Sequence, residues 1–256
     1  MEKSFTGVGD PGRGLDLLWG RQEPGRRGPK QRFSTEAVVQ AAITLADEVG
    51  VDGLSMRKVA EAVGVSPMSL YTYVPSKAEL IDLMFDRVLA EAPDPDPSMS
   101  GWRERLAYIA WMRWRLTERH PWLLDIAMRR PPIGPNVLRK VEIMIDALAG
   151  MGLEPAEIAL TAEALQHYIT GALQAAREDR ELERASGRTE EEWMAQAEAA
   201  FAEHPEAVGP GSRERIDVVR RKIFPLHVDV ADRFAFGLER LLDGVEAHIA
   251  VRRGGA

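Results

Sequence analysis

The sequence predicts an all-α protein, and three observations lead to that prediction. From residue 34 onward, apolar residues recur at helical spacing through almost the whole chain. The boundaries between these segments carry helix-capping residues, Gly or Pro. No run of alternating or continuous apolar residues is typical of a strand.

The composition is that of a folded chain without cysteine chemistry. Of the 256 residues, 45% are hydrophobic, which is enough to form a core. The chain has no Cys, which excludes disulfides and thiolate catalysis. No apolar stretch approaches the roughly 20 residues of a membrane span, and the first residues lack the pattern of a secretory signal. We therefore expect a cytoplasmic protein with no membrane partner.

The charge is unevenly distributed along the chain. Residues 21–33 contain five basic residues and one acidic residue (5 − 1 = +4), and Arg26, Arg27 and Lys30 are among the basic ones. From residue 81 onward, 23 basic and 30 acidic residues give 23 − 30 = −7. Together with their glycines and prolines, these charges predict that residues 1–33 form a flexible basic arm.

The arm also contains a nucleotide-binding pattern. Gly7, Gly9 and Gly12 spell G-x-G-x-x-G. That fingerprint binds a dinucleotide only between a strand and a helix, and no predicted strand precedes it here. We interpret these glycines as part of a linker.

The predicted helices follow one another with short connections. The first is capped by Ser34, runs to about Val49 and is ended by Gly50. A capping box from Ser76 to Glu79 opens another, which the proline-rich stretch from Pro93 stops. Later helices are predicted at about 101–119, 121–129, 135–150, 155–184, 190–203, 212–223 and 229–250.

Two short helical segments with a tight turn lie between the first two of these helices. Met56–Val63 has apolar residues at helical spacing, and Gly64 stands where a left-handed cap is needed. Ser66 can cap a second segment with Pro67 in its first turn. The pattern indicates a helix-turn-helix, whose second helix enters the major groove of DNA. An ordinary corner between two helices is the alternative, but the adjacent basic arm favours DNA binding.

The sequence resembles a known family over residues 34–83. The matching features are Leu-Ser-Met-Arg-Lys-Val-Ala, Gly-Val-Ser, Ser-Leu-Tyr-x-Tyr-Val and Ser-Lys-x-Glu-Leu. They resemble the N-terminal domain of TetR-type transcriptional regulators, and residues 233–249 resemble the last helix of the tetracycline-repressor-like C-terminal domain. The resemblance implies an all-helical homodimer that represses transcription and releases operator DNA when a small molecule binds. It implies a helix-turn-helix domain at 34–80 and an effector-binding and dimerisation domain at 81–256.

The DNA-contacting residues are expected on the helix-turn-helix and the arm. Hydroxyls of the second segment can donate to phosphates, and a Met can pack on a thymine methyl. No Arg–guanine or Asn–adenine pair is available there, so the operator sequence does not follow from these residues. Together, pattern and resemblance predict contacts from Arg26, Arg27, Lys30, Ser55, Arg57, Ser66, Pro67, Met68, Ser69, Tyr71, Thr72, Tyr73 and Lys77.

The C-terminal part is rich in Trp and Met, which line adaptable pockets as well as cores. A helical domain of this size needs a core in any case, so both interpretations stay open. In the functional interpretation, the Trp and Met residues line an apolar effector cavity. A few polar side chains in it would bind the effector, and Arg113 is one candidate. The predicted pocket residues are Trp111, Met112, Trp114, Met128, Met144, Gln166, His167, Tyr168 and Trp193.

Two apolar stripes are candidates for the dimer interface. They repeat at nearly heptad spacing within 155–177 and 229–250, and a four-helix interface between two chains would use both. The core of a single chain could also use them. The predicted interface residues are Ile158, Ala162, Leu165, Ile169, Phe234, Leu238, Leu241 and Val245.

Two other functions have less support. A helical enzyme would show a catalytic motif, and the chain has no H-E-x-x-H, G-x-S-x-G or Walker A sequence. A constitutive DNA-binding protein without an effector would lack an apolar cavity. The five His have no i, i+4 pair, and we expect neither a metal nor a cofactor.

Overall fold

The computed structural model describes residues 4–21, 33–127, 130–203 and 228–254, and most of these residues are helical. The predicted helix at 212–223 lies outside the described residues, as do Arg26, Arg27, Lys30 and Met128. The chain divides into two compact units, one of residues 1–169 with 244–256 and one of residues 170–243. The all-α class is confirmed.

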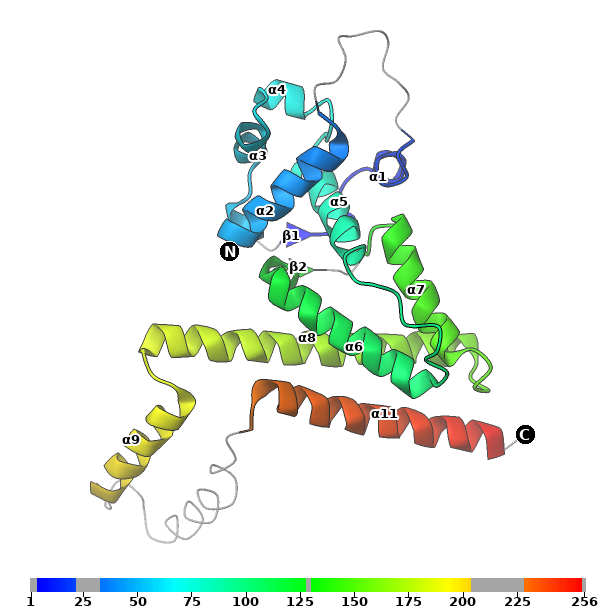
Figure 1. Ribbon diagram of the computed structural model, residues 1–256, viewed down its shortest axis with the longest axis vertical. Coiled ribbons are helices and arrows are strands. Elements are labelled where there is room, and N and C mark those ends of the chain that lie inside the picture. The colour runs from blue at the N-terminus through cyan, green and yellow to red at the C-terminus, as the bar shows by residue number, and fades with distance from the viewer. Residues whose placement is uncertain (1–3, 22–32, 128–129, 204–227, 255–256) are drawn as a thin grey trace. The chain divides into compact units, whose positions relative to one another are not determined.

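Helices α2, α3 and α4 form the predicted helix-turn-helix group. Helix α2 (Thr35–Gly53) is capped by Ser34 and is interrupted at Gly50, whose φ is 72°. Helices α3 (Met56–Val63) and α4 (Pro67–Leu70) follow, and Figure 1 shows them beside α2. Buried apolar residues of all three belong to one hydrophobic core.

Helix α5 (Lys77–Leu89) connects this group to the rest of the first unit. Ser76 caps it, as predicted, by accepting from the N–H of Ala78, and the Ser76 hydroxyl donates to the carboxylate of Glu79. Leu80, Met84 and Val88 are buried in the same core as α2. Figure 1 shows α5 leading from the N-terminal group toward α6 (Trp102–Arg119) and α7 (Pro135–Leu148).

The prediction of a flexible arm is wrong for residues 4–21. Strand β1 (Ser4–Phe5) pairs in parallel with β2 (Ile126–Ala127), and helix α1 (Pro11–Leu18) packs on α5. The indole of Trp19 donates to the carbonyl of Ile133 at 2.9 Å. The segment is ordered because its backbone and its apolar residues find partners more than 60 residues away.

Two glycines of the G-x-G-x-x-G pattern, Gly7 and Gly9, allow this docking. Gly7 has φ 65°, and a Cβ there would lie 2.8 Å from the carbonyl oxygen of Arg130. At Gly9 a Cβ would lie 2.7 Å from Oε1 of Glu79 on α5. The lack of side chains at Gly7 and Gly9 therefore allows the backbone to lie close to Arg130 and Glu79. The interpretation of these glycines as part of a linker is wrong.

The remaining elements follow the prediction with one exception. The helix predicted at 121–129 is not found at 121–127, where Pro121–Leu124 make a short 3₁₀ turn, η1, and β2 follows as the partner of β1. The helices α8 (Pro155–Ser186), α9 (Glu190–Glu203) and α11 (Val230–Gly254) lie near their predicted ranges. Within the second unit, Arg233 of α11 pairs with Asp179 of α8 at 2.8 Å.

One face of α5 carries three buried carboxylates. Glu79, Asp82 and Asp86 stand about one helical turn apart, and each accepts from backbone N–H groups of another segment. Asp82 accepts from Gly7 at 3.0 Å, and Asp86 accepts from Val137 at 2.9 Å. Burial raises the pKa of Asp82 and Asp86 above the usual value. These bonds join α5 to the N-terminal segment and to the start of α7.

We predict that Gly134→Ala lowers the stability of the chain by about 1–3 kcal/mol, because overpacking forces the neighbours apart. A Cβ at Gly134, the N-cap of α7, would lie 2.1 Å from Oδ1 of Asp86. Gly101→Ala is the matched control, since Gly101 caps α6 with similar backbone angles and a Cβ there meets nothing within 4 Å. Urea unfolding measures both, and equal midpoints would contradict the prediction.

Candidate DNA-binding surface and ligand cavity

The turn between α3 and α4 has the geometry that the sequence predicts. Gly64 adopts the left-handed conformation, with φ 77° and ψ 35°, and the N–H of Val65 donates to the carbonyl of Ala60 at 2.9 Å. The Ser66 hydroxyl accepts from the N–H of Ser69 at 3.1 Å and so caps α4. Leu70 is fully buried and anchors α4 to the core. These hydrogen bonds and the burial of Leu70 therefore fix the position of α4 on the core.

The opposite side of α4 is exposed. Met68 is 79% accessible and Tyr71 is 47% accessible, which is unusual for large apolar and aromatic side chains. Ser66, Pro67, Ser69 and Thr72 are exposed around them. An exposed Met beside hydroxyl groups suits contact with thymine methyls and phosphates.

Two of the predicted DNA contacts have other positions. Tyr73 is only 6% exposed and belongs to the core, because α4 ends at Leu70 and the chain then turns inward. The expectation that Tyr73 faces outward is wrong. Lys77 donates from Nζ to the carbonyl of Val51 at 2.8 Å, and burial lowers its pKa. Lys77 thus ties α5 to the end of α2, and its contact with a phosphate stays a prediction.

Helix α3 contributes a second set of candidates. Ser55 is its N-cap and accepts from the N–H of Lys58 at 3.3 Å, while Arg57 is exposed in the first turn. N–H groups at a helix start and a nearby cation suit a phosphate. Both residues remain predicted contacts.

A cavity of about 640 Å³ lies in the first unit, between α5, α6, α7 and the start of α8. Phe85 and Leu89 of α5 form part of its wall. Helix α6 adds four side chains, Tyr108, Ile109, Met112 and Arg113. Aliphatic residues of α7 and prolines of the connecting loops make up most of the rest. This is the size and character of a small-molecule site.

The structure places some of the predicted pocket residues at this cavity and others elsewhere. Met112, Met144 and Gln166 line it. Trp114 is buried, His167 is largely exposed, and Trp193 is exposed on α9. Neither these three nor Tyr168 lines the cavity. The prediction missed Phe85 and Leu89, because their helix already had a core face in the sequence pattern.

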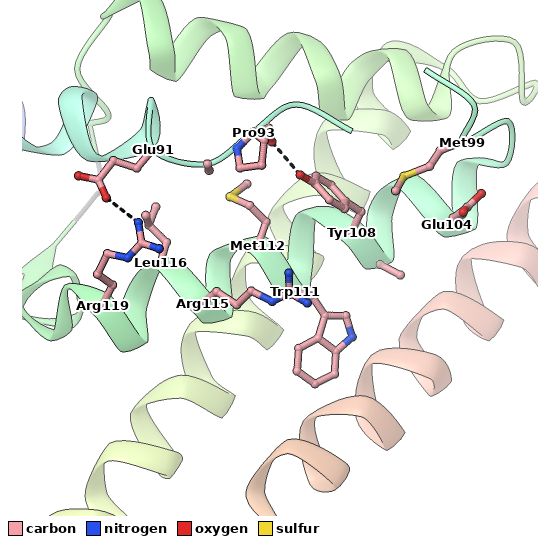
Figure 2. Close-up of a pocket in the computed structure, with 12 residues that line it drawn as sticks. Glu91, Pro93, Met99, Glu104, Tyr108, Trp111, Met112, Arg115, Leu116 and Arg119 are labelled. Carbon is pink, nitrogen blue, oxygen red and sulfur yellow. Dashed lines mark hydrogen bonds and ion pairs between the residues drawn. The ribbon is translucent and has the colours of Figure 1, made fainter. Parts of the chain in front are cut away.

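A smaller pocket of about 430 Å³ shares Pro93, Tyr108 and Met112 with the larger one. Figure 2 shows Trp111 at its edge and the Tyr108 hydroxyl directed at the carbonyl of Pro93, to which it donates at 2.9 Å. Arg119 pairs with Glu91 at 2.9 Å on the other side. The predicted Trp111 therefore lies at this pocket and not at the larger cavity.

The end of α6 is bonded to the helix-turn-helix group. His120 is buried, with Nδ1 2.8 Å from Asp47 of α2 and Nε2 3.1 Å from Glu91. The indole of Trp122 also donates to Asp47, at 2.7 Å. A helix that lines the cavity is thereby connected to a helix of the DNA-binding group.

Most residues of the two predicted dimer stripes are buried in the single chain or line the larger cavity. Leu165, Ile169, Phe234 and Leu238 are buried, so these side chains are not available to a second chain. Ile158 and Ala162 line the larger cavity. Leu241 and Val245 are half-buried. The interface prediction is wrong for the four buried residues, because a stripe that packs within a chain has the same spacing as one between chains.

Comparison with known proteins decides the family. Residues 38–84 match the model of bacterial regulatory proteins of the tetR family, and residues 94–249 match the tetracyclin repressor-like C-terminal domain. The HTH-type transcriptional repressor DrrR1 of Streptomyces coeruleorubidus is 38% identical over 250 residues, 97% of this chain and 90% of the relative. The chain belongs to the TetR family. It is a helix-turn-helix regulator of transcription.

Solved structures agree with this assignment. The crystal structure of apo ActR from Streptomyces coelicolor matches with a TM-score of 0.66 and 25% identity, covering 89% of this chain and all of that one. ActR in complex with actinorhodin matches with a TM-score of 0.65 and 25% identity, over 86% of this chain and 99% of that one. Among the described residues, no His, Asp and Glu cluster could hold a metal ion, and no helix is long and apolar enough to span a membrane.

We predict that Tyr71→Ala weakens binding to the DNA upstream of the gene by about 1–3 kcal/mol, because the exposed side chain of the residue that caps the end of α4 is lost from the interface. Trp193→Ala removes another exposed aromatic residue, on α9, and should leave the affinity unchanged. Fluorescence anisotropy with a labelled DNA fragment measures both. Wild-type affinity of the Tyr71 variant would show that α4 does not contact DNA.

Proposed function

We propose that this TetR-family regulator is a repressor that leaves its operator when a small molecule fills the larger cavity. The cavity of about 640 Å³ is the observation that carries the proposal, because a constitutive DNA-binding protein would have no need of it. The similarity to ActR, which has been crystallised with actinorhodin and with (S)-DNPA, supports a small-molecule ligand for this chain. The proposed partners are operator DNA, a small-molecule effector and a second copy of the chain, acting in the cytoplasm.

Two connections support communication between the cavity and α4. Phe85 and Leu89 of α5 form part of the cavity wall and also belong to the hydrophobic core that α5 shares with α2, α3 and α4. Helix α6 lines the cavity and ends at His120, which bonds to Asp47 of α2. A ligand that moves α5 or α6 would therefore shift the DNA-binding group. If the ligand binds one of the two conformations about 100-fold more tightly than the other, the coupling free energy between ligand and DNA binding is about 2.7 kcal/mol.

In this proposal, two copies of the chain associate through exposed apolar residues of α8 and α11. Leu160 and Leu182 of α8 and Phe236 and Val251 of α11 are all more than 60% exposed. Exposed side chains of this kind on long helices suit contact with a second copy. Two copies would also supply the two half-sites that a helix-turn-helix needs.

We predict that Ala159→Trp blocks induction and leaves DNA affinity intact. Ala159 lines the cavity, so a Trp there occupies space that the effector needs, and it is remote in sequence from α4. Ala164→Trp is the matched control, since Ala164 is exposed on the same helix and does not line the cavity.

A reporter gene under the chain's own upstream region measures both variants in cells, without knowledge of the effector. The Ala159 variant should repress under conditions in which the wild type and the control variant release the reporter. Release by the Ala159 variant to the wild-type level would contradict the assignment of the cavity.

We predict that Phe236→Glu weakens dimerisation at least tenfold, because a carboxylate would replace an apolar contact between two chains. The side chain is 66% exposed, so the change should spare the fold of the single chain. Trp193→Glu places the same charge on α9 and serves as the control. Analytical ultracentrifugation measures the dimer, and an unchanged dissociation constant for the Phe236 variant would remove α11 from the interface.

A further inference from the structure

The larger cavity is apolar apart from four side chains. Its described lining contains Tyr108, Arg113, Lys140 and Gln166, and the other described lining residues are apolar. A polar side chain in such a wall binds a ligand most readily when it is not already bonded within the chain, because no existing bond has to be given up. The partners of these four side chains therefore indicate which ligands the cavity suits.

Lys140 and Tyr108 are bonded to the loop that follows α5. The Lys140 ammonium donates to the carbonyl of Ala92 at 2.6 Å and pairs with Asp94 at 2.9 Å. The Tyr108 hydroxyl donates to the carbonyl of Pro93 at 2.9 Å, as Figure 2 shows. The charge of Lys140 is thus balanced by Asp94, and the hydroxyl proton of Tyr108 is already donated.

Arg113 is also engaged within the chain. It is only 7% exposed, and its guanidinium carbon lies 5.6 Å from the centre of the Phe85 ring. It has a further interaction within the chain besides this contact. An anionic ligand would therefore have to compete with the present partners of both cations, or would be buried without a partner of opposite charge, which is costly.

Gln166 differs from the other three side chains. Within the part of the chain that the structure describes, the side chain of Gln166 has no hydrogen bond. It lies on α8 one helical turn after Ala162 and two turns after Ile158, and both of these residues line the cavity. Its amide is uncharged and carries two N–H donors and a carbonyl acceptor. Gln166 can therefore bond to a ligand without losing a bond within the described chain.

We propose that the ligand of this cavity is an uncharged, largely apolar molecule with a hydroxyl, amine or carbonyl group that forms a hydrogen bond with Gln166. The inference rests on the proposed function, because it takes the cavity as the effector site. Burial of a neutral polar group costs far less than burial of a charge, and a hydrogen bond to the amide offsets that cost. A cationic ligand would find no Asp or Glu among the described lining residues.

Three anthracenes that differ in one substituent test this proposal. 1-Aminoanthracene is uncharged at neutral pH and has a hydrogen-bonding group, 1-methylanthracene has a methyl group in the same place, and anthracene-1-carboxylate is an anion. Fluorescence titration of the wild type should give a dissociation constant about tenfold lower, or less, for the amine than for the carboxylate, because the anion is buried unpaired. A wild type that binds the carboxylate as tightly as the amine would overturn the proposal.

A variant then assigns the hydrogen bond to one side chain. Gln166→Leu should reduce the preference for the amine over the methyl compound about fivefold, because the amine loses a hydrogen bond and the methyl compound loses none. Gln174→Leu is the matched control, since Gln174 is exposed two turns further along α8 and does not line the cavity. It should leave the affinities for all three compounds unchanged.

The outcomes separate this inference from the function on which it rests. If Gln166→Leu keeps the wild-type preference while both neutral compounds bind, the assignment of the hydrogen bond is wrong and the cavity remains a ligand site. If Ala159→Trp changes the binding of none of the three compounds, they do not occupy the cavity, and both the inference and the proposed effector site fail. Retained binding of 1-methylanthracene also shows that the Gln166 variant is folded.

Discussion

Buried carboxylates on α5 are the constraint on which the first unit depends. A carboxylate buried without hydrogen bonds would be strongly destabilising, so Glu79, Asp82 and Asp86 each need donors. The donors are backbone N–H groups of the segment before α1 and of the first turn of α7. Two segments more than 100 residues apart in the chain are thereby held against the same helix.

This arrangement makes α5 the common element of the two sites. Its apolar face completes the core beneath α4, and its last turns form part of the cavity wall. The start of α7, which supplies another wall, is bonded to Asp86. A displacement of α7 by a ligand would therefore act on α5 directly, and the packed core would pass it on because such cores do not deform gradually.

Local signals account for what the sequence predicted well. The helix-turn-helix depends on a left-handed Gly64, the cap at Ser66 and Pro67 in the first turn, all of which are chemical properties of single residues. The capping box at Ser76 is of the same kind. The expectation that Tyr73 lies on the surface requires α4 to continue beyond Leu70, but α4 ends there and Tyr73 is buried.

The features of the structure that the sequence did not predict depend on long-range contacts. The pairing of Ser4 with Ile126 has no local signature, so the N-terminal segment looked like a linker. The density of Trp indicated the cavity only in part, since Trp114 and Trp122 fill the core and the walls are mostly aliphatic. The spacing of Leu165 and Leu238 could not distinguish a partner helix in the same chain from one in a second copy.

The central claim is that a ligand in the cavity moves α4, and the distance between the two α4 segments of the proposed dimer tests it most directly. The chain has no native Cys, so a spin label at Met68→Cys, an exposed position of α4, gives one label in each copy. Double electron–electron resonance should give one distance distribution for the ligand-free protein, compatible with half-sites about 34–36 Å apart. Saturation with 1-aminoanthracene should shift it by several ångströms, and Ala159→Trp should abolish the shift. An unchanged distribution in wild-type protein with this compound in the cavity would contradict the account.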